Sequence, residues 1–213
     1  MADGPIIQAS SQRALESGAT IGKILEMVRE IRKQTLVPII LFSYLNPLYR
    51  YGLENLAAEG AEAGIDGVLI TDAVDEAAFV ASQILQRNGL DLISLIAPTT
   101  SDIRLERIAA GATGFIYAIS RTGVTGAGPG TASAAEQLVV RARKFTDLPI
   151  AVGFGISTRQ QIEDVWRYAD AAVVGSAIVA EIERSIPHGN VVEAVSDFAR
   201  GLVTPVANGS AGL

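Results

Sequence analysis

Two glycine-rich turns near the end of the chain have the composition of a small-anion site. GFGIST (153–158) continues the apolar run PIAVGF, and GSAIV (175–179) continues DAAVVG. Glycine lets the backbone approach a ligand closely, and free amides at a helix N-terminus can bind a phosphate without a lysine. Each turn alone could equally serve tight packing. Because both follow consecutive apolar runs, we favour a phosphate site.

Acid–base chemistry in this chain has to use carboxylates, tyrosines or lysines. The sequence contains no cysteine and one histidine, His188 in the turn IPHGN. These counts exclude thiolate chemistry and argue against a serine–histidine triad or a histidine metal cluster. We therefore predict no metal site and a solvated His188; no cofactor site is evident in the sequence either. The candidate groups are Asp3 in MADGP, Asp72 after VLIT, and Tyr44 and Tyr117 at the ends of apolar runs.

The residue types alone leave the roles of these groups open. Asp3 could be solvated at a frayed terminus or could belong to a functional loop. Asp72 could orient a partner or cap the following helix, and a tyrosine at a strand end could simply be core. SRTGVTGAGPGT (120–131) is too long and glycine-rich for an ordinary turn, which predicts either a disordered surface loop or a mobile lid.

The overall composition favours a soluble, cytoplasmic protein. With 213 residues, 49% of them hydrophobic, the chain can bury a large core in one domain or two. No apolar run approaches the roughly 18 residues of a membrane span, and the first ten residues lack the features of a signal peptide. The net charge of −6 argues against a nucleic-acid partner, since binding a polyanion needs a basic surface.

Short apolar runs alternate with segments of helical spacing along the whole chain. The runs are continuous in their apolar character, as in a parallel sheet covered by helices. Ser157 or Thr158 is expected to cap one helix, and Ser101 or Asp102 another. The predicted strands are 37–43, 66–71, 91–97, 114–120, 149–154 and 170–175. After an opening helical stretch, the predicted helices are 17–33, 52–64, 75–88, 102–110, 132–145, 158–167 and 190–201.

This alternation leaves two architectures, a doubly wound open sheet and a (β/α)₈ barrel. Six strands fit the open sheet, but its dinucleotide fingerprint is missing, since GAGPG (126–130) does not join a strand directly to a helix. Barrels have eight strands in about 250 residues and bind phosphate on the loops after strands seven and eight. If GFGIST and GSAIV are these loops, the chain holds strands three to eight and begins in the loop after strand two.

The loops resemble those of the alpha subunit of tryptophan synthase. ADGPIIQASSQRALESG resembles the loop and helix after the second strand of that family, and SYLNPLYRYG (43–52) its third strand–helix junction. ISRTGVTG (119–126) resembles the sixth loop, and GFGIST and GSAIV resemble the phosphate-binding turns. These motifs occur in the order of the family and cover nearly the whole chain.

The resemblance implies a (β/α)₈ barrel that cleaves indole-3-glycerol phosphate to indole and glyceraldehyde 3-phosphate. Asp3 matches the aspartate that accepts the indole N–H and stabilises the indoleninium, and Tyr117 matches the tyrosine beside the reacting centre. The resemblance also implies a β-subunit partner in an α₂β₂ assembly. The remaining residues implied for substrate binding are Tyr44, Asp72 and Ile96 around the indole, Thr125 and Gly126 in the closing loop, and Phe154, Gly155, Gly175 and Ser176 at the phosphate.

The chain departs from the family pattern in two places. It reads TDAVDEAAF after the fourth family strand, where an Asp-Leu-Pro sequence is usual, so the role of Asp72 is less secure. The family's proton-shuttling glutamate, on strand two, has no counterpart in these residues. We therefore expect residues 1–205 to form one barrel domain lacking two βα units, with a flexible tail at 206–213 and little lyase activity. A start assigned at an internal methionine would explain this boundary.

Two other functions fit parts of the pattern. A catalytically silent alpha-like subunit would keep the phosphate turns and regulate the β subunit. Another phosphate-binding barrel enzyme of amino-acid biosynthesis would also keep those turns, but ADGPIIQ and SRTGVTG argue against it.

Overall fold

The chain alternates parallel strands and helices around a curved sheet. The computed structural model describes residues 3–119, 131–153 and 155–203. Within these ranges the strands are β1 (Ile40–Ser43), β2 (Gly67–Ile70), β3 (Asp91–Ile96), β4 (Ile116–Ile119), β5 (Ile150–Gly153) and β6 (Ala171–Val173). The helices are α1 (Pro5–Glu16), α2 (Ile21–Arg32), α3 (Leu45–Tyr51), α4 (Leu53–Ala63), α5 (Asp75–Arg87), α6 (Asp102–Gly111), α7 (Thr131–Ala142), α8 (Arg159–Val165), α9 (Ser176–Ser185) and α10 (Val191–Val203), with a 3₁₀ turn at Ile186–His188.

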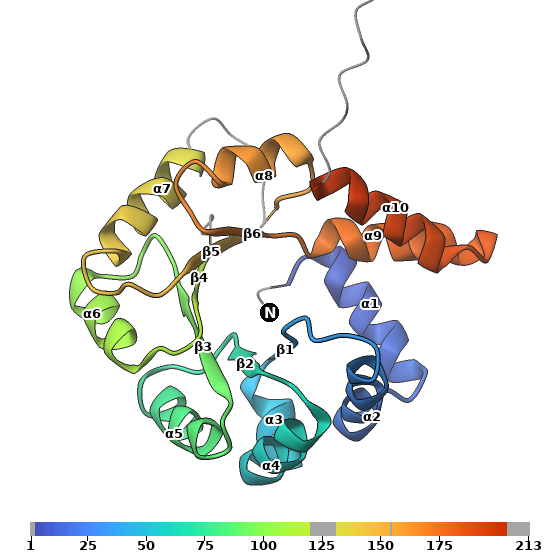
Figure 1. Ribbon diagram of the computed structural model, residues 1–213, viewed down its shortest axis with the longest axis horizontal. Coiled ribbons are helices and arrows are strands. Elements are labelled where there is room, and N and C mark those ends of the chain that lie inside the picture. The colour runs from blue at the N-terminus through green and yellow to red at the C-terminus, as the bar shows by residue number, and fades with distance from the viewer. Residues whose placement is uncertain (1–2, 120–130, 154, 204–213) are drawn as a thin grey trace, which may run out of the picture.

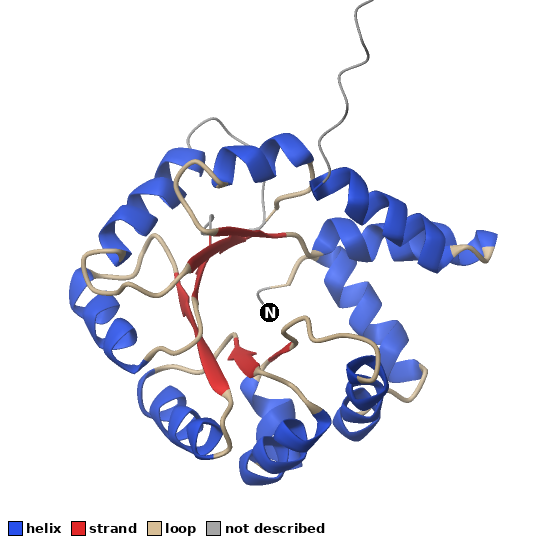
Figure 2. Cartoon of the chain, viewed as in Figure 1, coloured by secondary structure: helices blue, strands red, loops and turns tan. Residues whose placement is uncertain are grey.

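The six strands form one sheet in chain order, and every neighbouring pair is parallel. Figures 1 and 2 show that the sheet curls around a central space and that the helices form a ring outside it. This is the arrangement of a (β/α)₈ barrel, with β1 and β6 as the two edges of the described sheet. The predicted barrel-type fold and all six predicted strands are confirmed.

Side chains of each strand divide between an outer core and the lumen. On β4, Ile116 and Ala118 pack in the outer core, whereas Tyr117 packs with Leu69 and Ile93 in an inner cluster. This alternation follows from the strand period of two residues. We call the inner cluster the lumen cluster; its other members are Ile40, Leu95, Phe115, Ile119 and Val173. Because both faces of the sheet are apolar, the strands appear in the sequence as continuous apolar runs.

Two helix starts are capped as the sequence predicted. Thr158 accepts a hydrogen bond from the Gln161 amide and forms a capping box with it, and Ser101 accepts one from the Arg104 amide. Two short helices were not predicted as separate elements, α3 and α9, although GSAIV was expected to start a helix. His188 is exposed, as predicted.

The N-terminal helix closes the helical ring across the open side of the sheet. In Figure 1, α1 lies between α9 and α2. Arg13 of α1 and Glu183 of α9 form an ion pair of 3.0 Å, although 170 residues separate them. This contact joins α1, which begins two residues after Asp3, to the helix that follows β6. None of the helices in the described ranges is long and apolar enough to cross a membrane.

Aspartates at the starts of two strands fix the opposite end of the sheet. Asp170 Oδ2 accepts the Ile150 amide and an Arg143 N–H, both at 2.7 Å. Asp66 likewise accepts the Ile39 amide at 2.7 Å and pairs with Arg32. Each aspartate lies directly before one strand, and its carboxylate bonds the start of the neighbouring strand. Contacts at this end of a barrel serve stability.

We expect Asp170 to make the stability of the fold depend on pH. The hydrogen bond from the Ile150 amide and the pairing with Arg143 lower the pKa of this carboxyl below its ordinary value of 3.8. Its ionised form therefore favours the folded state, so its contribution is complete above that ordinary value and is lost as the pH falls through the folded-state pKa. The urea midpoint of Asp170→Asn should be lower than that of the parent at pH 7, and the difference should shrink below pH 3.8. Asp147→Asn, at an exposed site shortly before β5, is the matched control and should leave the urea midpoint unchanged at both pH values. Equal midpoints for the parent and Asp170→Asn at pH 7 would refute the role of Asp170.

Candidate active site

The predicted site residues that the structure describes gather at the carboxyl ends of the strands. Tyr44 directly follows β1, Asp72 lies two residues after β2, and Tyr117 lies on β4. Gly155 and Gly175 each lie two residues after a strand, β5 and β6 respectively. Since all the strands are parallel, these ends form one edge, which is the functional face of a barrel.

The Asp3 carboxylate is attached to this edge by Tyr44. The Tyr44 hydroxyl donates to Asp3 Oδ2 at 2.6 Å, and the Gln8 side chain donates to the Asp3 carbonyl at 2.7 Å. Pro5 begins α1 directly after Gly4, a position where proline's missing N–H costs nothing. Asp3 is half-buried and not a solvated terminal residue. It is therefore available as a fixed negative charge at the strand ends.

Tyr117 forms part of an aromatic wall in the lumen. Its side chain is 9% exposed, and its ring lies 6.3 Å from that of Phe42 on β1, with an angle of 33° between the planes. Burial raises the pKa of the Tyr117 phenol above its ordinary value of 10.0. The hydroxyl is therefore protonated at neutral pH and can donate a hydrogen bond.

Gly153 makes room for the Tyr117 side chain. A Cβ atom at this position would lie 2.0 Å from the Tyr117 hydroxyl oxygen and 2.5 Å from Cζ. Gly153 lies within β5, so it is not simply a turn residue of the kind the sequence suggested. This contact and the position of Phe42 were missed, because the continuous apolar runs do not reveal which residues of a strand face the lumen.

The turn at Gly175 presents backbone amides at a helix N-terminus, as an anion site requires. Gly155 has a φ of +78°, a conformation that favours glycine. Gly175 is the N-cap of α9, is exposed and has no atom within 4 Å of a Cβ placed on it. Its carbonyl accepts the Ile178 amide at 3.0 Å, so the amides of Ser176 and Ala177 precede the first intrahelical bond and can donate to a ligand.

Asp72 and Ile96 have clear partners within the fold. Asp72 Oδ1 accepts the Leu45 amide, the first N–H of α3, at 2.6 Å. Ile96 is 1% exposed and packs in the outer core with Leu105 and Ile116, whereas its neighbour Leu95 packs in the lumen cluster. Substrate contact by either Asp72 or Ile96 stays a prediction. Thr125, Gly126 and Phe154 lie outside the described residues, so their predicted roles also stay predictions.

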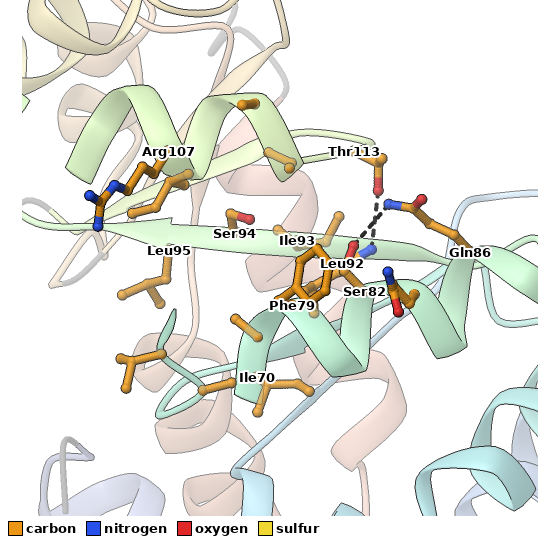
Figure 3. A pocket seen from close by; sticks show the side chains of 18 of the residues that line it. Ile70, Phe79, Ser82, Gln86, Leu92, Ile93, Ser94, Leu95, Arg107 and Thr113 are labelled. Atoms are coloured by element: carbon orange, nitrogen blue, oxygen red, sulfur yellow. Dashed lines mark hydrogen bonds between the residues drawn. The ribbon is translucent and has the colours of Figure 1, made fainter. Parts of the chain in front are cut away.

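A separate groove of about 700 Å³ lies between α5 and α6, over β3. Figure 3 shows Phe79 of α5 at one edge of β3, Arg107 of α6 at the other, and the end of the Gln86 side chain close to Thr113. The described residues that line this groove include neither an aspartate nor a glutamate. It therefore lacks the acid–base groups of the strand-end site, which is the better candidate.

Comparison with protein families gives a match over almost the entire chain. The model described as "Tryptophan synthase alpha chain" matches residues 1–204. A curated relative of that name from Solibacter usitatus is 44% identical over 202 residues, which cover 95% of this chain and 76% of the relative. Another of the same name, from Geobacter sulfurreducens, is 47% identical over 184 residues, covering 86% of this chain and 70% of the relative.

Solved structures give the same result for the fold. A tryptophan synthase A-subunit from Pyrococcus furiosus superimposes with a TM-score of 0.85 at 34% identity, covering 95% of this chain and 81% of that one. Tryptophan synthase subunit alpha from Legionella pneumophila gives a TM-score of 0.84 at 32% identity, with coverages of 95% and 75%. The 213 residues thus span about three quarters of the length of several such relatives.

Proposed function

This chain belongs to the tryptophan synthase alpha chain family, and we propose that it binds indole-3-glycerol phosphate and takes part in its cleavage to indole and glyceraldehyde 3-phosphate. Family membership makes it a lyase-type chain of tryptophan biosynthesis. The observation that carries the proposal for this particular site is the hydrogen bond of 2.6 Å between the Tyr44 hydroxyl and Asp3. It holds a carboxylate at the same strand-end edge as the two glycine turns.

The reaction requires charge stabilisation and two proton movements. Protonation of the indole ring at C3 gives an indoleninium cation, which turns the ring into a leaving group. The side-chain hydroxyl then loses its proton as the C–C bond breaks, its oxygen becomes the aldehyde carbonyl, and the bonding electron pair returns to the indole. A carboxylate near the ring N–H stabilises the cation because it bears a full negative charge where positive charge develops.

The described residues supply distinct parts of this chemistry. Asp3 would accept the indole N–H and stabilise the cation, while Tyr44 fixes the orientation of its carboxylate. Phe42 and Tyr117 would contact the flat indole ring in the lumen. The amides of Ser176 and Ala177 would donate to the phosphate at the far end of the substrate. The proton shuttle implied by the resemblance is a glutamate with no counterpart in the 213 residues.

We propose, in addition, that the chain works with a tryptophan synthase β subunit in an α₂β₂ assembly in the cytoplasm. Family membership supports this proposal. The functional face of the barrel is also the face at which a second subunit could receive indole. Pull-down of a purified β subunit by the 213-residue chain tests the pairing.

A charge placed on the first residue of α9 should separate phosphate binding from indole binding. We expect Ser176→Asp to weaken affinity for glycerol 3-phosphate at least about tenfold relative to Ser176→Asn, because a carboxylate beside the free amides repels the anion. An acid in the first turn of a helix favours the helix itself, so folding should be preserved. Titration calorimetry with glycerol 3-phosphate and with indole measures both affinities. Equal phosphate affinity in the two variants would place the anion elsewhere.

A further inference from the structure

We propose that Asp72 is a positioning residue that acts on the Asp3 carboxylate through Tyr44. This inference deepens the proposed function and rests on it, because Asp3 is the group that would contact the indole. In this role Asp72 binds the backbone of the neighbouring strand–helix junction and does not contact the substrate.

The first step is the hydrogen bond between Asp72 and the start of α3. Tyr44 is the N-cap residue of α3, with φ −88° and ψ 160°, and its side chain makes no capping hydrogen bond. The carboxylate of Asp72 instead reaches the Leu45 amide from the next loop, at 2.6 Å. It therefore provides an acceptor for the first N–H group of α3, which has no partner within the helix.

The second step is the fixed position of Asp72 itself. The Thr71 amide donates to the Ser43 carbonyl at 3.0 Å, which extends the pairing of β1 and β2 up to the residue before Asp72. Two backbone segments, 43–45 and 71–72, are thus joined at consecutive positions. The backbone of Tyr44 lies between the two bonded residues, Ser43 and Leu45, and is held on both sides.

The third step leads from Tyr44 to Asp3. The phenol extends away from this anchored backbone to Asp3 Oδ2 at 2.6 Å, and Asp3 is 41 residues away in the sequence. Loss of the Asp72 bond frees the Leu45 amide and the first turn of α3, and so lets the Tyr44 ring shift. Because a hydrogen bond weakens steeply with misalignment, a small shift of the ring would leave Asp3 poorly oriented.

The proposal predicts an effect confined to the indole end. Asp72→Ala should weaken indole binding about three- to tenfold, less than the full value of a hydrogen bond made by a charged group, because the effect reaches Asp3 only through Tyr44. Asp72→Asn keeps an oxygen acceptor for the Leu45 amide and should retain most of the affinity. Affinity for glycerol 3-phosphate should be equal in all three proteins, because Gly175 and Ser176 lie at the other end of the site.

A double-mutant cycle distinguishes action through Tyr44 from a direct contact. In a Tyr44→Phe background the link to Asp3 is already broken, so Asp72→Ala should have no further effect on indole affinity measured by calorimetry. A second readout needs no ligand: the NMR shift of the Tyr44 Cζ carbon in protein labelled with ¹³C-tyrosine. Asp72→Ala should move this signal in the same direction as Asp3→Ala does, and Asp72→Asn should not.

The outcomes separate this inference from the proposed function. An undiminished effect of Asp72→Ala in the Tyr44→Phe background, or an unmoved Tyr44 signal in Asp72→Ala, would overturn the positioning role. Failure of the parent chain to bind indole or glycerol 3-phosphate would instead count against the proposed function, while the NMR comparison would still decide the role of Asp72. Urea unfolding of each variant confirms that the proteins compared are folded.

Discussion

The 213-residue polypeptide is expected to release indole from indole-3-glycerol phosphate about 10²–10⁴-fold more slowly than the same polypeptide extended by two βα units whose second strand ends in a glutamate. The size of this deficit is that of one missing general acid–base group. In the described site, Asp3 can stabilise the indoleninium, and its hydrogen bond to Tyr44 fixes it in that role. Because Asp3 would accept the ring N–H in this role, delivery of a proton to C3 needs a second acid–base group within reach of that carbon.

The control for this experiment is a glutamine at the same place in the added strand. The extended polypeptide with glutamine should be as slow as the 213-residue chain, which would show that the carboxyl group and not the added barrel wall restores the rate. Rapid cleavage by the 213-residue chain alone would disprove the expectation. If the chain raises the activity of a β subunit without cleaving substrate at all, it acts as the silent regulatory subunit considered above.

Gly153→Ala is expected to lower the stability of the fold through a steric clash in the lumen. The added Cβ would lie 2.0 Å from the Tyr117 hydroxyl oxygen and 3.1 Å from Val173 Cβ. The buried Tyr117 ring would have to leave its position, and overpacking of this kind costs about 1–3 kcal/mol. A lower urea midpoint, together with weaker indole binding, is the predicted result.

Gly201→Ala is the matched control for this substitution. Gly201 lies in α10, is exposed, and has no atom within 4 Å of an added Cβ. Alanine is the better helix former by roughly 0.5–1 kcal/mol, so this variant should be slightly more stable than the parent. Combining Gly153→Ala with Tyr117→Ala tests the cause directly, because the clash is absent from that pair. A midpoint for Gly153→Ala equal to that of the parent would show that Tyr117 does not need the space.

The layout of the fold could be predicted from the sequence because it follows from local patterns. Six continuous apolar runs gave the six strands, and the caps at Ser101 and Thr158 marked two helix starts correctly. The lumen wall could not be assigned in the same way, since strands that are apolar on both faces hide their two-residue alternation. Phe42 and Leu95 therefore emerged only from the structure.

The contacts that position the site depend on residues far apart in the chain. Asp3 and Tyr44 are 41 residues apart, and Asp72 is 27 residues from Leu45. Their types and their places at strand ends indicated a common edge of the sheet. Which oxygen meets which donor depends on the packing of α1 against α9 and on the pairing of β1 with β2, and no local pattern encodes either one.

Titration of indole-3-glycerol phosphate into the 213-residue chain tests the central claim most directly. The claim is that one edge of the barrel holds the indole beside Asp3 and the phosphate on the turn at Gly175 and Ser176. We predict a single saturable site, weakened at least about tenfold both by Asp3→Ala and by Ser176→Asp, while Ser176→Asn binds as the parent does. The absence of binding by the parent, or binding that neither Asp3→Ala nor Ser176→Asp weakens, would contradict the claim.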